Sequence, residues 1–297
     1  MSGSPRVTQH SVAMRVLAGL QGNLDRLGRT QEQLSSGKQL TRPSDSPTRA
    51  VSAMQLRSAA RAQDQYARNA SDGLGWLGTI DSALTSTLDA VRRVRDLTVQ
   101  GMSTGAAGPD ARAAIAIEVK SLREAVIGLA NTRYLDRPVF GGTTAGNAAY
   151  DSATGAYVGD PGSVDRTVAS GAVVPVNVVG TDVFGNAGTG LLKVLDDISV
   201  HLTSDPSALS ADLGELDTAL QATTTTLASV GARYSRVEQA QKAAGLSGDS
   251  LRAQLSDVED VDLPKTLVDL SLQQTAYQAA LGAASRVVQT SLVDFLR

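Results

Sequence analysis

The sequence predicts a mainly helical fold with a small β-rich insertion. Leucine, valine and alanine recur at three- and four-residue spacings near both ends of the 297-residue chain, as in helix seams. Aromatic residues make up only 3 % of the sequence, which suits thin helical layers better than one thick core. Residues 1–70 hold ten Lys/Arg and four Asp/Glu, a net +6, whereas residues 190–297 hold eight and fourteen, a net −6. The opposite net charges of the two ends favour an elongated antiparallel helical rod, with N- and C-terminal heptad helices paired at one end.

The first expected helix carries a heptad seam that stops at Gly37. Its seam positions are His10, Ala13, Leu17, Leu20, Leu24, Leu27, Gln31 and Leu34. The stretch that follows, within "LSSGKQLTRPSDSP", combines a glycine, basic residues and two prolines. A phosphate-binding loop would need glycine at position 32 and Ser or Thr at position 39, where the chain has Glu32 and Gln39. We therefore interpret this stretch as a joint between helices.

The next two helices have clear start signals. Ser46 is a candidate N-cap, and Pro47 suits the first helical position because its missing N–H needs no partner there. Helical spacing continues from there to about Met102. After the break "STGAAGPD", a third helix carries apolar residues from Ile115 to Leu129.

Residues 141–187 are expected to form an inserted β-rich domain. Short valine-rich runs between turn residues, as in "AYDSATGAYVGD" and "GAVVPVNVVG", predict β-hairpins. Two matching triplets, Val139-Phe140-Gly141 and Val183-Phe184-Gly185, mark the edges of this insertion.

Helix is expected again from Leu191, and a long seam runs from Leu209 to Val258. The stretch "DVEDVDLP" breaks it, and a second seam begins five residues later, out of register with the first. This break is the expected second half of the joint. Its residues across both halves are Lys38, Arg42, Pro43, Asp45, Pro47, Asp260, Asp262 and Pro264, with Lys38 and Arg42 expected to face Asp257, Glu259, Asp260 or Asp262.

Three domains follow from these breaks. Residues 1–45 and 259–297 would form a terminal coiled-coil domain, residues 46–140 and 188–258 a helical rod, and residues 141–187 the insertion. Terminal helices of about 30 residues are marginal alone and bury little as a pair, so they are expected to need further partners. The expected assembly residues are Leu17, Leu20, Leu24, Leu27, Leu34, Leu263, Leu267, Leu270, Tyr277, Leu281, Val288 and Phe295.

The sequence contains little catalytic chemistry. There is no cysteine, so disulfides and thiolate metal sites are excluded. His10 and His201 are the only histidines and are interpreted as structural or solvated, and neither an H-E-x-x-H nor a G-x-S-x-G motif occurs. The acidic run from Asp257 to Asp262 lacks the glycine and final glutamate of a calcium loop. We expect no catalytic site, no cofactor and no metal.

Cellular placement and binding to other macromolecules are also constrained. No apolar run approaches 18 residues, and the N-terminus lacks the apolar region of a cleaved signal peptide. Membrane insertion is therefore not expected. The basic first 70 residues leave nucleic-acid binding by a coiled coil as an alternative, although acidic residues are interspersed and no aromatic residue precedes Tyr66.

Several stretches together resemble the flagellin superfamily, and within it the hook-associated proteins of the hook–filament junction. They are "LSSGKQLTRPSDSP", "ARNASDGLGWLGTIDSALTS", "ANTRYLDRPVFGGT", "VGARYSRVE" and "DLSLQQTAYQAALGAASRVVQTSLVDFL". The wording "RPSD" and "FGGT" favours the junction branch, with flagellin itself as the alternative. The chain departs from the pattern in its small insertion, where "GAYVGD" stands in the place of a "VYN"-like strand.

The resemblance implies a structural role outside the cell. Such proteins are exported unfolded by the flagellar type III apparatus without a cleaved signal, and they form a ring between hook-associated protein 1 and the first flagellin subunits. The implied partners are therefore hook-associated protein 1, flagellin, further copies of the chain, and an export chaperone on the C-terminal helix from Leu263 to Phe295.

Overall fold

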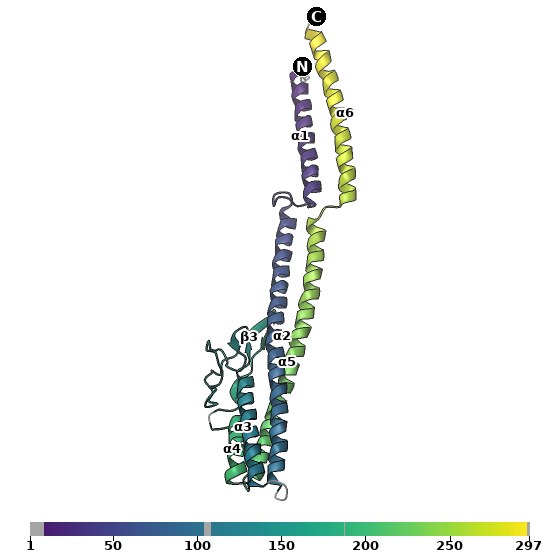
Figure 1. Ribbon diagram of the computed structural model, residues 1–297. Helices are drawn as coiled ribbons and strands as arrows, with labels where there is room; N and C mark the ends of the chain where they lie inside the picture. Colours follow the sequence, from purple (N-terminus) through teal and green to yellow (C-terminus); the bar gives the residue numbers. More distant parts are fainter. Residues whose placement is uncertain (1–8, 104–107, 187, 296–297) are drawn as a thin grey trace. The chain divides into compact units, whose positions relative to one another are not determined.

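The computed structural model describes residues 9–103, 108–186 and 188–295, with only the backbone described for 9–13 and 286–295 (Figure 1). The described helices are α1 (Gln9–Ser36), α2 (Pro47–Met102), α3 (Pro109–Ala130), α4 (Leu191–Ser204), α5 (Leu209–Glu259) and α6 (Leu263–Phe295). The described strands are β1 (Arg133–Tyr134), β2 (Arg137–Pro138), β3 (Asp165–Ala169) and β4 (Ala172–Pro175), and a 3₁₀ turn spans Gly180–Asp182. The mainly helical fold with a small β insertion is confirmed.

The chain divides into two compact units. Residues 1–61 and 249–297 form one, here called the terminal unit, and residues 62–248 form the other, the central unit. The helices α2 and α5 contribute residues to both units. The division into three domains at residues 45, 140, 187 and 258 stays a prediction.

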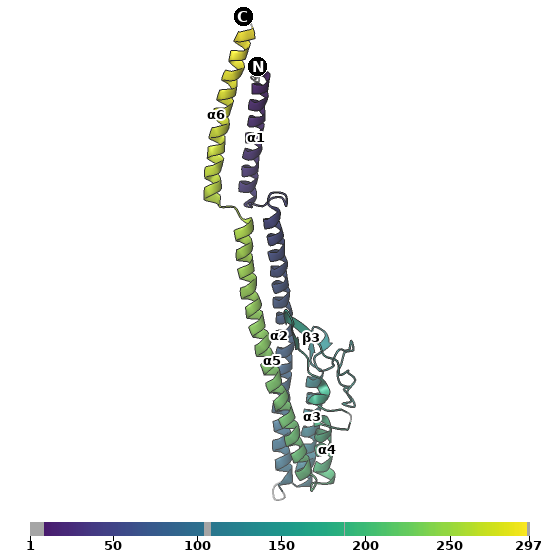
Figure 2. The ribbon, with the colours of Figure 1, turned by 180° about the vertical axis from the view of Figure 1, so that it is seen from behind.

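In the terminal unit, α1 and α6 pack against each other along their length. They run in opposite directions, so the first turn of α1 and the last turn of α6 lie at the same end of the pair (Figures 1 and 2). The expected pairing of the two terminal helices is therefore confirmed. None of the described helices combines the length and apolarity that crossing a membrane requires.

In the central unit, α3 packs against α4, and both share one hydrophobic core with α2 and α5. The close approach of α4 to α2 depends on Gly101, because a Cβ there would lie 2.4 Å from Leu202 Cδ2. Fully buried apolar residues from all four helices form this core, among them Leu77, Ile80, Leu84, Val119, Val126, Leu195, Ile198, Leu209, Val230 and Val237. Burying these side chains is the main stabilising contribution of the central unit.

The two matching triplets of the sequence meet in the structure. Phe140 and Phe184, the centres of the two matching triplets, are fully buried and meet edge to face with ring centroids 5.0 Å apart. The Phe140 carbonyl also accepts the Gly180 N–H at 2.9 Å. Tyr150 and Tyr157 join these rings, so four aromatic side chains gather at the base of the insertion.

One expected hairpin is short: the Val158 N–H donates to the Ala149 carbonyl at 2.8 Å, and the Asp151 N–H donates to the Ala156 carbonyl at 2.9 Å. Strands β3 and β4 pair antiparallel as the valine pattern predicts, but "AYDSATGAYVGD" forms only an isolated bridge between Tyr150 and Tyr157. Asn131 supplies the missing partners: its Oδ1 accepts the N–H groups of Ala149 and Tyr150 at 2.9 and 2.8 Å, and its Nδ2 donates to the Tyr150 carbonyl. The amide therefore satisfies backbone groups of Ala149 and Tyr150 that the short hairpin leaves unpaired.

Candidate functional site

The predicted joint consists of two short segments of the terminal unit that pair with each other. Lys38 and Asp260 form an antiparallel bridge. The Gln39 N–H donates to the Glu259 carbonyl at 2.6 Å, and the Val261 N–H donates to the Gly37 carbonyl at 3.0 Å. The chain reverses into this bridge at Gly37, whose φ of +68° favours glycine. The end of α1 is thereby tied to the end of α5.

A buried carboxylate lies at the centre of the joint. The Glu259 side chain is only 4 % exposed, and its Oε1 lies 2.8 Å from Arg57 Nε of α2. This contact is an ion pair without hydrogen-bond alignment, because Oε1 has no partner in hydrogen-bonding geometry. Lys38 Nζ approaches the other carboxylate oxygen at 3.6 Å. Glu259 therefore links three chain segments electrostatically.

Lys38 also pairs with Asp260, with Nζ 2.5 Å from Oδ1. The hydrogen bond to Asp260 raises the pKa of Lys38, and the nearby Asp260 and Glu259 charges add to this effect. The hydrogen bonds from Lys38 and from Ser256 lower the pKa of Asp260. Both groups stay charged near neutral pH, so Lys38 faces Asp260 as the charge pattern predicted.

The interpretation of Arg42 is wrong. Its guanidinium lies 3.7 Å from Glu32 Oε2 of α1, and among the described residues it forms no ion pair with the acidic residues of the second segment. The reason is a local turn: Asp45 Oδ2 accepts the Arg42 N–H at 2.8 Å and the Thr41 hydroxyl at 3.1 Å. The Arg42 N–H is the main cause of the lowered pKa of Asp45. Asp45 therefore stabilises its own loop.

The remaining joint residues start helices. Pro47 is the first residue of α2, and Pro264 lies in the first turn of α6. Asp262 caps α6, because its Oδ1 accepts the Lys265 N–H at 3.1 Å. A cavity of about 180 Å³ opens beside Glu259 and is lined by the loop through Pro43 and by α2.

The predicted assembly residues fall into two groups. Leu17, Leu24, Leu263, Leu267 and Leu281 are exposed, each by 44 % or more. By contrast, the half-buried members of the set are Leu20, Leu27, Leu34, Leu270 and Tyr277. Val288 and Phe295 belong to α6, but their side chains lie outside the described part of the structure. Five large apolar side chains on two paired helices thus remain open to solvent.

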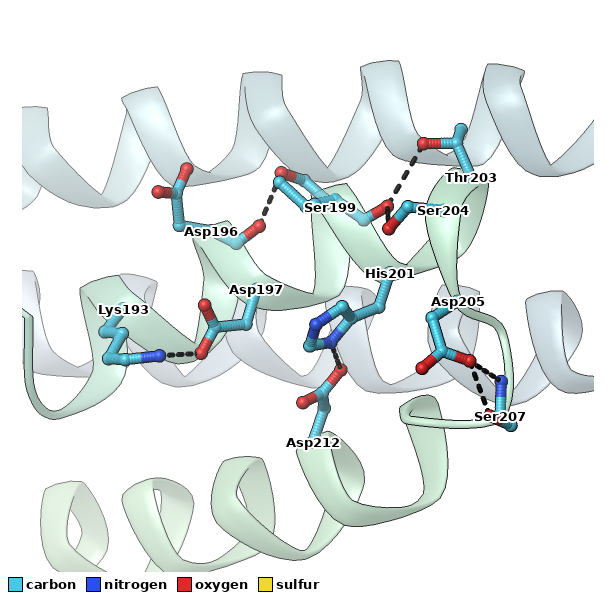
Figure 3. Close-up of polar contacts among 11 residues, drawn as sticks. Lys193, Asp196, Asp197, Ser199, His201, Thr203, Ser204, Asp205, Ser207 and Asp212 are labelled. Carbon is cyan, nitrogen blue, oxygen red and sulfur yellow. Dashed lines mark hydrogen bonds and ion pairs between the residues drawn. The ribbon is translucent and has the colours of Figure 1, made fainter.

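The central unit holds one histidine–carboxylate pair (Figure 3). His201 Nδ1 of α4 lies 2.7 Å from Asp212 Oδ2 in the first turn of α5. The hydrogen bond to Asp212 is the main cause of the raised pKa of His201, with contributions from Asp197 and Asp205. The nearby hydroxyl of Ser199 donates to the Asp196 carbonyl, so the drawn contacts show no histidine-activated nucleophile. The pair links two helices.

Metal binding finds no support in the described residues, since none of their His, Asp and Glu side chains cluster in groups of three or more suited to an ion. The arrangement is therefore one of ion pairs, helix caps and exposed apolar stripes. Such features position chains against one another.

Two family models match most of the chain. The bacterial flagellin N-terminal helical region matches residues 7–143, and the bacterial flagellin C-terminal helical region matches residues 213–296. The chain belongs to the flagellin family. It is a structural protein of the bacterial flagellum, an appendage outside the cell, and not an enzyme.

Relatives include both flagellins and flagellar hook-associated proteins. The chain is 26 % identical to flagellin of Bacillus subtilis, over 97 % of its own length and 98 % of the relative's. It is also 26 % identical to flagellar hook-associated protein 3 of Escherichia coli, over 88 % and 90 %. Among solved structures, a flagellar hook-associated protein described as putative from Vibrio parahaemolyticus aligns with a TM-score of 0.65 at 20 % identity, covering 73 % of this chain and all of that one. Bacillus cereus FlgL aligns at 0.60 and 22 %, covering 68 % and 99 %.

Two features of this flagellin-family chain escaped the sequence interpretation. Arg57 is the strongest partner of Glu259, yet nothing in the spacing of α2 distinguishes it from the other arginines there. The inner face of the terminal pair also includes Thr30 and Gln273, which hydrogen-bond at 2.9 Å. A heptad pattern that ranks positions by apolarity passes over both residues.

Proposed function

We propose that the chain is flagellar hook-associated protein 3, the junction protein that joins hook-associated protein 1 to the first flagellin subunits. Overall identity does not separate this role from that of flagellin, because both kinds of relative are 26 % identical. Two local motifs favour the junction role, namely "RPSD" in the joint and "FGGT" at the edge of the insertion.

The "FGGT" motif has a defined structural role in this chain. Gly142 has a φ of +70°, and a Cβ there would lie 1.9 Å from the Asp160 carbonyl oxygen. Asp160 Oδ1 accepts both the N–H and the hydroxyl of Thr143 at 2.9 Å. These hydrogen bonds are the main cause of the lowered pKa of Asp160, together with the Gly162 N–H. Asp160 is the last residue of "GAYVGD", so the sequence that replaces the "VYN"-like strand holds the motif.

Assembly through the terminal helices is the mechanism that the geometry supports best. The observation that carries it is the row of exposed leucines on the described faces of the α1–α6 pair, Leu17, Leu24, Leu263, Leu267 and Leu281. Exposed apolar area of this extent is unusual on a protein that acts alone. Neighbouring copies in a ring, and the adjoining hook-associated protein 1 and flagellin subunits, would cover these side chains.

An export chaperone is the remaining proposed partner. In the free chain, α6 presents Leu263, Leu267, Leu272 and Leu281 to solvent, together with Val268. Chains that expose such surfaces before assembly associate nonspecifically. A chaperone that covers α6 during export by the flagellar type III apparatus would prevent this association.

Copy number tests the junction role against flagellin. In a source strain that carries an epitope-tagged gene, we expect label only at the boundary between hook and filament, in the amount of one ring. Deletion is expected to leave hooks without filaments while flagellin accumulates in the medium. Label along the whole filament would instead identify the bulk subunit and overturn the junction assignment.

Leu281→Asp tests the assembly surface separately. Because Leu281 is 44 % exposed, the substitution is expected to leave the melting temperature of the purified chain within about 2 °C while motility is lost. Val173→Asp, at an exposed valine of the β insertion, is the matched control and should swim normally. Normal swimming of the Leu281→Asp strain would contradict assembly through this stripe.

A further inference from the structure

The terminal helices each carry two stripes of seam positions beside a shared row of half-buried residues. The shared rows are Leu20, Leu27 and Leu34 on α1 and Leu270, Tyr277 and Ala284 on α6. The stripe facing the partner helix, called the inner stripe, is Val16, Asn23 and Thr30 on α1 and Thr266, Gln273 and Ala280 on α6. The exposed one, called the outer stripe, is Leu17, Leu24 and Gln31 on α1 and Leu267, Gln274 and Leu281 on α6.

The structure buries the less apolar of the two stripes. A partial turn of each helix about its own axis would exchange them, since the inner and outer positions are neighbours in sequence and share the rows beside them. That turn would bury four leucines and two glutamines in place of Val16, Asn23, Thr30, Thr266, Gln273 and Ala280, and the hydrophobic effect favours burial of the leucines. A specific interaction must therefore hold the inner stripe in place.

The hydrogen bond between Thr30 and Gln273 provides such an interaction. Thr30 is only 7 % exposed, and in the described part of α1 and α6 only Thr266 is equally buried. Thr30 Oγ1 lies 2.9 Å from Gln273 Oε1 and 3.0 Å from the Arg26 carbonyl oxygen of its own helix. A hydroxyl with its single proton serves one acceptor at a time, and the Gln273 amide offers both an acceptor and donors. The amide therefore satisfies Thr30 whichever way the proton points.

We infer that Thr30 and Gln273 select which faces of α1 and α6 pair within the chain. Turning the outer stripe inward would break this hydrogen bond, and it would bury the side-chain amides of Gln31 and Gln274 in its place, which costs free energy unless those amides find partners. A polar pair in an apolar seam acts in this way in coiled coils, where it specifies one arrangement among several. If the chain assembles as proposed, this selection also keeps the outer-stripe leucines turned toward neighbouring copies. Only this consequence rests on the proposed function.

Disulfide formation in the purified monomer tests the selection without any assembly. The natural chain has no cysteine, so engineered pairs report without background. Asn23→Cys with Ala280→Cys places a pair on the inner stripe, and Gln31→Cys with Gln274→Cys places one on the outer stripe at a matching height. In the otherwise unchanged chain, the inner pair is expected to cross-link faster than the outer pair.

The deciding variant is Thr30→Ala with Gln273→Ala. We expect the ratio of inner to outer cross-linking rates to fall roughly tenfold, the factor that corresponds to one net hydrogen bond. Thr30→Ser keeps the hydroxyl and should keep the ratio. Thr275→Ala is the matched control, because this exposed threonine of α6 also bonds to its own helix, with Oγ1 2.9 Å from the Ser271 carbonyl oxygen.

Two results would overturn the inference. An unchanged ratio in the double alanine variant would show that packing alone chooses the face. Loss of both cross-links, with helicity lost from the terminal unit in circular dichroism, would show that the pair holds the helices together rather than selecting between faces. Because every measurement uses the monomer, failure of the junction assignment would leave these results unaffected.

Discussion

Substitution of Arg57 is expected to destabilise the joint more than substitution of Glu259, the carboxylate that Arg57 contacts. Arg57→Met leaves Glu259 charged, 4 % exposed and with Lys38 as its remaining cation at 3.6 Å. Glu259→Gln instead removes the buried charge and leaves Arg57 and Lys38, which are 55 % and 45 % exposed and can be hydrated. The asymmetry follows from burial, since an unpaired charge is far more costly in the interior than at the surface.

The geometry sets the size of the difference. At 2.8 Å the Arg57–Glu259 attraction amounts to about 6 kcal/mol with an effective dielectric constant near 20, before desolvation is subtracted. Loss of one partner of a buried ion pair costs about 3–5 kcal/mol of folding free energy. We expect about 3 kcal/mol for Arg57→Met, because Lys38 remains as a second cation near Glu259. Glu259→Gln should cost about 1 kcal/mol, because the two cations left behind are largely solvated. The double variant should resemble Glu259→Gln alone.

Amide hydrogen exchange at the joint measures this difference directly. The N–H groups of Gln39 and Val261 donate across the bridge, so their protection reports its opening. We expect protection to fall about 150-fold in Arg57→Met and about fivefold in Glu259→Gln, at about 1.4 kcal/mol per factor of ten. Arg61→Met, at an exposed arginine four residues further along α2, is the control and should change neither amide.

The reasoning fails if Glu259→Gln lowers protection as much as Arg57→Met. It also fails if the double variant is as damaged as Arg57→Met alone, because relief of the buried charge is the predicted cause of the asymmetry. Either result would mean that shape and packing at Glu259, rather than its charge, hold the joint closed.

Three further outcomes are expected. Gly37→Ala should destabilise the terminal unit by about 1 kcal/mol, because its φ is +68° while the space around a Cβ is open; an unchanged melting curve would contradict this. His201→Phe should cost more stability at about pH 5.5 than at about pH 9: Asp212 raises the pKa of His201, so the pair's contribution is complete below about 6.5 and is lost as pH rises through the folded value. Equal losses at the two pH values in urea denaturation would refute that sign. Phe184→Ala should cost about 4 kcal/mol, since the ring is fully buried against Phe140, and a loss below about 1 kcal/mol would show that the insertion repacks.

The sequence determined most element boundaries of this chain. Gly37 ends the first seam, Pro47 starts α2, and Leu263 with Pro264 starts α6, as the backbone preferences of glycine and proline require. The matching triplets around Phe140 and Phe184 also located the base of the insertion. These signals are local, so neighbouring residues suffice to produce them.

The interpretation of contacts between segments was less complete. Asp45 holds Arg42 in a turn, and Arg42 therefore lies near Glu32 instead of crossing the joint. Asn131 binds the backbone N–H and carbonyl of Tyr150 beside its hairpin, which no alternation pattern can indicate. In each case a single polar side chain makes the deciding contact. The composition of the neighbouring sequence carries no signal of that contact.

The sequence by itself therefore determined the helices, the paired ends, the joint and the flagellin-like layout. Only the tertiary structure decided which faces meet. Periodicity ranks Leu17 and Leu267 as seam residues, yet Thr30 and Gln273 are the ones turned inward on the described helices. The physical reason is that a pattern of apolar residues is read from one helix at a time. A hydrogen bond instead requires two atoms from distant parts of the chain to lie within 3 Å of each other.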